Sequence, residues 1–371
     1  MVATVDNPHH LKMIRQVGLE ALVYPPEVHP SDMWACWSDE AYVKESIRAD
    51  LELIERTGAV AIAHDSKLSV PMSAAIAGIG CVSICQIQQC LNFEYAGMGP
   101  VELWQRGLDG INRVLASHGQ PPVERDLREL YLRGVTMLPS VPEFEPLPEG
   151  FPVESARYVG PLTGLSVSEA IADRSDLADD VSDDRGQGVF FYRTIGVNPS
   201  LPEFRAAFED LGDRVYVATG LPRRAEELSR ACAGTGFQIR DMWDMNVIRR
   251  RAAVSVIHGG HGSCMSCLET GLPAVVLPGD NPERGTNGAS LAALGVAVNL
   301  PAAASYHINW GQTVETSGAV PPWSQTRSHV NRLAADGEVR ARSALWRDRL
   351  AALGPDVAVD VIASAEPYQA R

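Results

Sequence analysis

Short apolar runs alternate along most of this chain with longer stretches that mix apolar and polar positions at helical spacing. Continuous apolar runs are typical of strands buried in a parallel sheet, and the mixed stretches are typical of the helices that cover it. The pattern predicts strands at 3–5, 59–63, 81–85, 189–192, 215–218, 254–257 and 274–277. It predicts helices at 10–16, 39–56 and 70–77 in the first half. This alternation of strands and helices predicts an α/β fold with parallel sheets.

The chain has 371 residues, more than one hydrophobic core usually organises, so we expect two domains. A proline-rich segment at 146–161 leads into an acidic stretch with few aromatic residues, which is typical of a linker. We therefore place an α/β domain at 1–160, a linker at 161–187 and a second α/β domain at 188–342. The remaining residues, 343–371, predict a helix that is interrupted at Gly354 and Pro355 and crosses back to the first domain. Two α/β halves facing each other across a cleft are the simplest such architecture.

Charge and composition narrow the class of protein. Hydrophobic residues make up 45% of the chain, and the net charge of −14 disfavours partners such as nucleic acid or an anionic membrane. The N-terminus lacks the apolar stretch of a signal peptide, and no run reaches the roughly 20 apolar residues of a membrane span. The seven cysteines are odd in number and lie in apolar surroundings, which favours reduced thiols. We expect a soluble cytoplasmic protein.

The most informative segment of the sequence runs from Val254 to Gly295. An apolar strand is followed by a glycine-rich turn, a helix that we expect to be opened by Ser263, and a second apolar strand; the turn consists of His258, Gly259, Gly260, His261 and Gly262. A bare turn at a helix N-terminus lets backbone N–H groups approach an anion, and the helix dipole favours negative charge there. The segment predicts a site for a phosphorylated ligand at 259–263.

Other interpretations of this segment remain open. The turn also fits a plain connection between strand and helix. His258, His261, Cys264 and Cys267 fall at three-residue intervals and raise the alternative of a zinc site, which requires four converging ligands. The Cys-X-X-Cys pair would be redox-active only if its thiolates were stabilised at the helix start, whereas burial would make both thiols inert. The arginines at 249–251 are typical of a solvated helix end.

The same segment carries a family resemblance. The stretches HGGHGS, ETGLPAVVLP and ERGTNGASLAALG resemble the donor-binding motif of inverting nucleotide-sugar glycosyltransferases of the GT-B fold, especially bacterial enzymes that modify macrolides, enediynes and aromatic polyketides. Weaker matches extend outward: LPSVPEFEP and YVGPL resemble the approach to the family's linker, and VFFYRTIG resembles the first strand and glycine turn of its nucleotide-binding half. The resemblance covers most of the chain and implies two Rossmann-like domains.

The resemblance implies donor-binding residues in the second half. His258 and the amides of 260–263 would hold the donor diphosphate. The family places an Asp-Gln pair four and three residues before an asparagine, where the pair binds sugar hydroxyls; measured from Asn287, those positions hold Glu283 and Arg284. Arg284 departs from the pattern. The remaining residues implied at the donor site are Met242 and Trp243 near the nucleobase, where a core role for Trp243 is equally open, and Gly196 in the first glycine turn.

In the first half the resemblance implies one catalytic residue and the loss of another. A carboxylate at the end of the strand AVAIAHD orients a catalytic histidine in the family, which implies that role for Asp65. The histidine sits in a Gly-His turn after the family's first strand, upstream of the segment that here begins almost at Met1. The first domain is thus expected to lack its usual first strand.

That strand lies centrally in a doubly wound sheet, and its loss would leave backbone groups unpaired. We therefore expect that the true reading frame starts upstream. The alternative is a different base, for which the nearby candidates are His9, His10 and His64. Alternation along the strand should point the side chain of His64 away from that of Asp65.

The resulting expectation is transfer of a sugar from a dTDP- or UDP-sugar to a hydroxyl of a hydrophobic small molecule in secondary metabolism, as in antibiotic biosynthesis, with inversion. No catalytic metal or other cofactor is needed, because the helix N-terminus stabilises the leaving diphosphate. Two alternatives are a nucleotide-sugar epimerase and a catalytically inactive partner of an active transferase, and a homodimer is left open. An acceptor pocket is a weaker hypothesis than core packing for one group of residues: Trp34, Trp37, Tyr42, Gln86, Gln88, Phe93, Tyr95 and Trp104.

Overall fold

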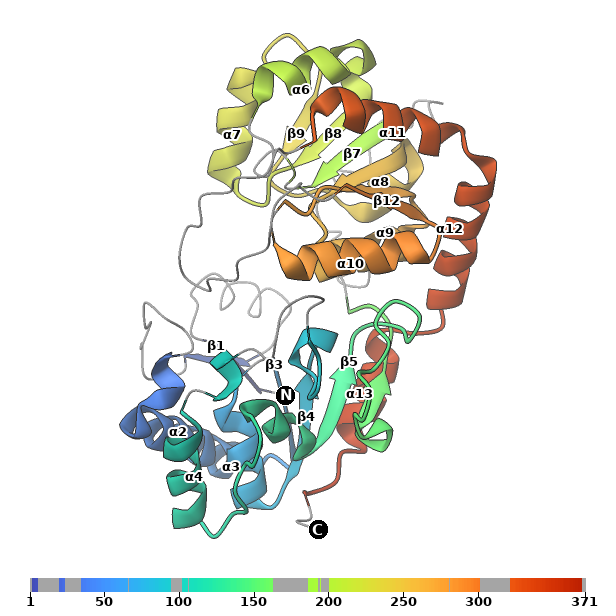
Figure 1. The fold of residues 1–371 in the computed structure, drawn as a ribbon. Helices are drawn as coiled ribbons and strands as arrows, with labels where there is room; N and C mark the ends of the chain where they lie inside the picture. The colour runs from blue at the N-terminus through green and yellow to red at the C-terminus, as the bar shows by residue number, and fades with distance from the viewer. Residues whose placement is uncertain are drawn as a thin grey trace. The chain divides into compact units, whose positions relative to one another are not determined.

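The computed structural model describes residues 2–5, 20–23, 35–65, 67–94, 102–105, 107–162, 186–192, 194, 200–279, 281–300 and 321–368. The chain divides into two compact units (Figure 1). The first consists of Met1–Val159 and Pro355–Arg371, and the second of Gly160–Gly354. Several predictions lie outside the described residues: the helix at 10–16, most of the linker, and the residues His9, His10, Trp34, Tyr95 and Gly196.

The first unit contains two parallel sheets among its described residues. Strand β1 (Val2–Val5) pairs with β2 (Glu20–Val23). The second sheet has four strands in chain order: β3 (Ala61–Asp65), β4 (Gly80–Ile84), β5 (Val135–Leu138) and β6 (Ala156–Tyr158). Its helices are α2 (Glu40–Thr57), α3 (Ser69–Ala77), α4 (Leu108–Ser117) and α13 (Pro355–Ala363). Short 3₁₀ helices join these elements: Ala35–Ser38, Ile87–Gln89, Glu102–Gln105, Leu127–Leu132 and Val153–Ser155.

The predicted strand at 59–63 is displaced by two residues, because β3 begins at Ala61 and ends at Asp65. The cause is the end of α2. Gly58 adopts a left-handed φ of 61° and closes the helix, and the chain then needs Ala59 and the exposed Val60 to reach the sheet. Asp65 is therefore the last residue of the strand.

The second unit is built on a six-stranded parallel sheet in the order β12-β11-β10-β7-β8-β9. Its strands are β7 (Gly188–Tyr192), β8 (Val215–Ala218), β9 (Gln238–Arg240), β10 (Ala252–Ile257), β11 (Ala274–Val276) and β12 (Ala297–Asn299). The chain starts at the centre with β7, runs outward to β9, and returns to build the other side from β10 (Figure 1). In doubly wound sheets of this order, ligands bind at the carboxyl ends of the two strands where the direction reverses. Here those strands are β7 and β10.

Alternate residues of β7 enter two different cores, which is why this strand reads as a continuous apolar run. Val189 and Phe191 pack with Trp323 and the other residues of one cluster, whereas Phe190 and the partly buried Tyr192 belong to another. The helices of this unit are α6 (Leu201–Phe208), α7 (Pro222–Ala231), α8 (Met245–Arg251), α9 (His261–Thr270), α10 (Pro282–Ala293), α11 (Trp323–Ala335) and α12 (Gly337–Leu350), with a 3₁₀ helix at Glu209–Arg214.

The end of the chain is helical on both sides of the predicted interruption at Gly354 and Pro355, but the helix before it begins earlier than the predicted Ser343. Helix α12 begins at Gly337, where the Asp336 side chain accepts hydrogen bonds from the amides of Glu338 and Val339. Helix α13 begins at Pro355 and packs on β3 and β4 of the first unit. None of the helices in the described residues combines the length and the apolar composition needed to span a bilayer.

The aromatic core around Phe191 should dominate the stability of the second unit. Its ring is fully buried, with the ring centroids of Phe204 and Phe208 at 5.0 and 4.9 Å. We expect Phe191→Ala to lower the free energy of unfolding of this unit by about 3–5 kcal/mol, because the truncation leaves a cavity. Urea unfolding followed by tryptophan fluorescence measures this. Leu345→Ala, at a site 69% exposed, is the control and should change it by less than about 0.5 kcal/mol; equal effects would contradict the packing described.

Candidate functional site

The glycine-rich turn lies directly after β10, at the reversal point of the sheet. Gly259 has a φ of +84°, and Gly260 is the N-cap of α9, which begins at His261. The prediction that Ser263 opens the helix is wrong by two residues: the first helical hydrogen bond runs from the Cys264 amide to the Gly260 carbonyl, at 3.0 Å. The hydroxyl of Ser263 instead donates to the Gly260 carbonyl at 2.7 Å.

Close packing excludes a side chain at both glycines. A Cβ on Gly259 would lie 2.7 Å from the carbonyl oxygen of Arg284, in a left-handed conformation that already disfavours other residues. A Cβ on Gly260 would lie 2.7 Å from Nε2 of His258, so the imidazole lies over the start of α9. The ring of His258 also packs against Tyr192, at a centroid distance of 5.5 Å.

Asn287 holds the glycine turn from the interior of the protein. Its side chain is 1% exposed, and Nδ2 donates a hydrogen bond to the Gly259 carbonyl at 3.1 Å. This contact lies within the protein, so the residue that the resemblance implied at the donor shapes the turn. Glu283 and Arg284 occupy the first turn of α10, which is capped by Asn281 through its bond from the Arg284 amide at 3.0 Å. Both residues are partly exposed beside the glycine turn.

The arrangement presents backbone donors to a ligand. The amides of 260–263 are the first four of α9 and have no acceptor within the helix, since helical bonding begins at Cys264. Among the described residues no side chain caps this helix. Amides at a helix start and the positive end of the dipole together favour an anion such as a phosphate. The turn can therefore bind a phosphate group without a metal.

Tyr192 and Thr194 are neighbours of this turn that the sequence did not single out. Tyr192 ends β7, opposite Ile257 of β10, and contacts His258. Thr194 is fully buried just beyond. Tyr192, as the last residue of β7, could have been identified once the strand order was known.

Trp243 and Met242 differ sharply in exposure. Trp243 is 8% exposed, and its Nε1 donates to the Val217 carbonyl at 3.1 Å. Tyr216 meets the Trp243 ring edge-on, and the Arg240 guanidinium lies 4.2 Å from its centroid. Met242 is 58% exposed. Trp243 thus has the core role that the sequence left open, and Met242 is the side chain available to a ligand.

In the first unit, Asp65 is exposed at the carboxyl end of β3, whereas His64 is 7% exposed. Nε2 of His64 lies 2.8 Å from Oγ of Ser83 on β4. Burial lowers the pKa of His64 to about 3, and the charge of Lys67 adds to the shift. The imidazole therefore stays neutral at physiological pH, and its ring nitrogens are not accessible to a substrate.

The zinc and redox interpretations do not fit the structure. All seven cysteines are buried thiols, and burial raises the pKa of Cys267 to about 12. A thiol with such a pKa is not a reactive nucleophile. The described residues contain no cluster of three or more His, Cys, Asp or Glu side chains able to hold a metal.

The aromatic residues considered for an acceptor pocket are largely core. Trp37 and Trp104 are both 6% exposed, and Tyr42 and Phe93 pack against the same cluster. Gln86 caps the 3₁₀ helix Ile87–Gln89, and Gln88 is half-buried beside it. The arginines at 249–251 end α8 and are at least partly exposed, as predicted.

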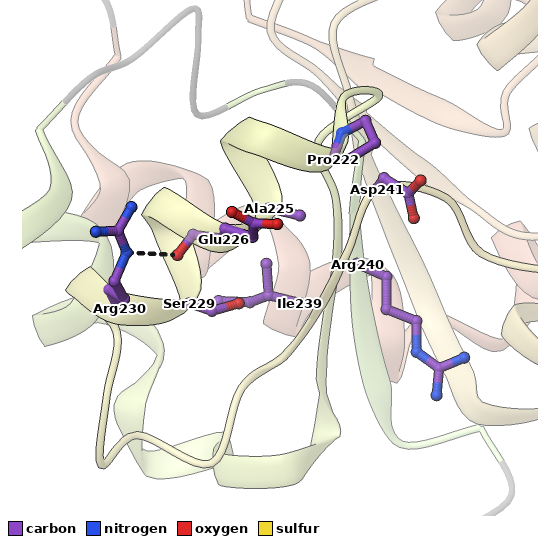
Figure 2. Close-up of a pocket in the computed structure, with 8 residues that line it drawn as sticks. All are labelled: Pro222, Ala225, Glu226, Ser229, Arg230, Ile239, Arg240 and Asp241. Atoms are coloured by element: carbon purple, nitrogen blue, oxygen red, sulfur yellow. Dashed lines mark hydrogen bonds between the residues drawn. The ribbon is translucent and has the colours of Figure 1, made fainter.

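A hollow of about 590 Å³ lies between α7 and the edge strand β9 (Figure 2). Its lining consists of Pro222, Ala225, Glu226, Ser229, Arg230, Ile239, Arg240 and Asp241. Figure 2 shows the side chains of Arg230 and Arg240 directed away from each other on opposite sides. None of the residues predicted to bind a ligand lines this hollow, and its cationic groups do not converge.

Comparison with known proteins identifies the fold. No protein-family model and no curated protein matches the chain. Among solved structures, the glycotransferase of kitacinnamycin is 18% identical with a TM-score of 0.68, over 99% of this chain and 91% of that one. CalG4, the calicheamicin glycosyltransferase, is 17% identical with a TM-score of 0.66, over 98% and 90%. SsfS6 of Streptomyces sp. SF2575, complexed with thymidine diphosphate, is 16% identical with a TM-score of 0.60, over 98% and 91%.

At these identities the likeness shows the fold. It confirms the expectation of two Rossmann-like α/β domains of the GT-B type. The absence of the usual first strand stays a prediction.

The turn itself can be tested with two neighbouring glycines. Gly259→Ala should lower the free energy of unfolding by about 1–3 kcal/mol, because it combines a left-handed φ with a collision at the Arg284 carbonyl. Gly262→Ala is the matched control, since a Cβ there meets nothing within 4 Å, and it should leave stability unchanged or raise it by up to about 1 kcal/mol. Urea titrations of both variants measure these changes. An unchanged free energy of unfolding in Gly259→Ala would contradict the conformation described for the turn.

Proposed function

We propose that this protein is a glycosyltransferase that moves a sugar from a nucleoside diphosphate sugar to a hydroxyl group of a hydrophobic small molecule, with inversion at the anomeric carbon. The observation that carries the proposal is the glycine turn at the reversal point of the second sheet, where the first four amides of α9 have no acceptor within the helix. The fold likeness to glycosyltransferases supports the proposal. One of these similar structures, that of SsfS6, contains bound thymidine diphosphate.

The donor would lie across the carboxyl ends of β7 and β10. The diphosphate would accept hydrogen bonds from the amides of 260–263 and from Nε2 of His258, the ring atom nearest Gly260 in a side chain that is 8% exposed. Exposed Met242 would contact the base of dTDP or UDP, and Glu283 would accept bonds from sugar hydroxyls. Arg284 places a cation next to the turn, where it would add to the attraction for the diphosphate.

The reaction would be a single displacement. The acceptor oxygen forms a bond to the anomeric carbon as the bond from that carbon to the diphosphate oxygen breaks, and a base takes the hydroxyl proton. Negative charge develops on the departing diphosphate, where the fixed amides of α9 stabilise it without a metal. Asp65, exposed at the end of β3, is the carboxylate we assign to the acceptor side, where it orients the base. His64 is not that base, because it is buried, neutral and bonded to Ser83.

The names of the matching structures, which include kitacinnamycin and calicheamicin enzymes, favour a natural-product acceptor and a role in cytoplasmic secondary metabolism. An inactive partner protein would bind nucleotide without turnover, and an epimerase would convert a donor with no acceptor present. Nucleotide binding and turnover, measured with and without an acceptor, separate these alternatives, and light scattering would test for a homodimer.

We expect the protein to bind UDP or dTDP in calorimetric titrations, and His258→Ala to weaken that binding by about 10- to 100-fold, because one hydrogen bond to a charged group is lost. Circular dichroism should show an unchanged fold. The control is His118→Ala, at an exposed position of the first unit. Unchanged nucleotide affinity in His258→Ala would overturn the donor site.

Turnover should depend on Asp65. We expect Asp65→Asn to lower kcat by about 10²-fold or more with little change in donor affinity, because the carboxylate acts on the acceptor side. Asp109→Asn, which removes another exposed carboxylate of the same unit, should leave kcat unchanged. Donor consumption and product formation are followed by chromatography with a panel of hydroxylated aromatic acceptors; wild-type turnover in Asp65→Asn would refute the role.

A further inference from the structure

We propose that two polar contacts, the buried pair of His64 with Ser83 and the partly buried pair of Lys67 with Asp50, hold the main chain on either side of Asp65, and that these four residues position its carboxylate. The inference rests on the proposed function, in which Asp65 serves the acceptor side. We call these two contacts the clamp. They meet the chain one residue before and two residues after Asp65.

The first half of the clamp joins β3 to β4. His64 and Ser83 are direct partners in the parallel register, and their side chains lie 2.8 Å apart at Nε2 and Oγ. Both residues are buried, at 7% and 0% exposure. The ring of His64 also packs near Tyr131, at a centroid distance of 5.9 Å. The strand is thereby fixed in rotation just before its last residue, and Asp65 is directed to the surface.

The second half joins the segment after β3 to two helices. Nζ of Lys67 lies 2.9 Å from Oδ1 of Asp50 on α2, and the two side chains are 28% and 3% exposed, so the carboxylate is the buried partner. The other oxygen of Asp50 accepts a hydrogen bond from Oγ of Ser73 on α3, at 3.1 Å. One buried carboxylate therefore ties together α2, α3 and the segment that follows Asp65.

Stability alone does not account for these groups. A buried ion pair loses so much hydration that apolar residues of similar size often serve stability as well or better. A site that needs a carboxylate in one place benefits from buried partners that lock the backbone beside it, because small displacements of a reacting group cost large factors in rate. In the clamp, a buried contact lies before the exposed carboxylate of Asp65 and a partly buried ion pair lies after it.

The test removes each half with little change in shape. Asp50→Leu combined with Lys67→Met replaces the ion pair by apolar groups, and Ser83→Ala removes the partner of His64. We expect each change to lower kcat about 10-fold with donor KM and nucleotide Kd unchanged. The single variant Lys67→Arg, in which Asp50 is retained, should have a kcat close to that of the unmodified protein, because a cation still pairs with Asp50. The controls are Lys44→Met on an exposed ion pair of the same helix, and Ser140→Ala at another buried serine of this unit.

A double-mutant cycle separates positioning from a merely structural role. In an Asp65→Asn background the clamp variants should lower kcat by less than about twofold, because there is no carboxylate left to position. Equal losses in both backgrounds, or no loss with Asp65 present, would overturn the clamp. If Asp65→Asn itself retains full turnover, the catalytic assignment fails instead, and this result is distinguishable because it needs no clamp variant.

Discussion

The candidate donor site depends on one hydrogen bond, from the side-chain amide of Asn287 to the carbonyl of Gly259. Gly259 turns the chain through a left-handed conformation and is buried, so its carbonyl needs a partner within the protein. With that carbonyl bonded inward, the following amides face outward as the first donors of α9. Asn281 acts in parallel by capping α10, so that the first turn of a second helix is placed beside the turn. The anion site is thus made largely by backbone, and the side chains mainly determine the shape of that backbone.

The two units offer different chemistry at the carboxyl ends of their strands. In the second unit the reversal between β7 and β10 exposes helix amides, which suit a diphosphate. In the first unit β3 ends in an exposed carboxylate, and the adjoining buried polar groups bond to each other. In the proposed sugar transfer the amide cluster would stabilise the leaving diphosphate, and the carboxylate would orient the base that takes the acceptor proton.

Much of this could be predicted from the sequence, and the failures have physical causes. Strand β8 occupies the predicted residues, because its four apolar residues are all buried in the sheet and have polar residues on both sides in the sequence. Strand β3 was predicted two residues too early. Gly58 ends α2 in a left-handed conformation, and two further residues connect it to the strand. The helix α9 was predicted to open at Ser263, yet it begins at His261 with Gly260 as its N-cap, where a Cβ would collide with the imidazole of His258. The roles of Asn287 and of the Lys67–Asp50 pair depend on contacts between segments 28 and 17 residues apart, which local patterns do not report.

The central claim is that a nucleoside diphosphate binds at the amides of 260–263. It is tested most directly by recording amide NMR spectra of the protein during titration with dTDP and with UDP. The account predicts that the amide resonances of Gly260, His261, Gly262 and Ser263 move most, in a saturable way, and that those of the hollow between α7 and β9 do not. Shifts confined to that hollow, or no saturable shift with either nucleotide, would contradict it.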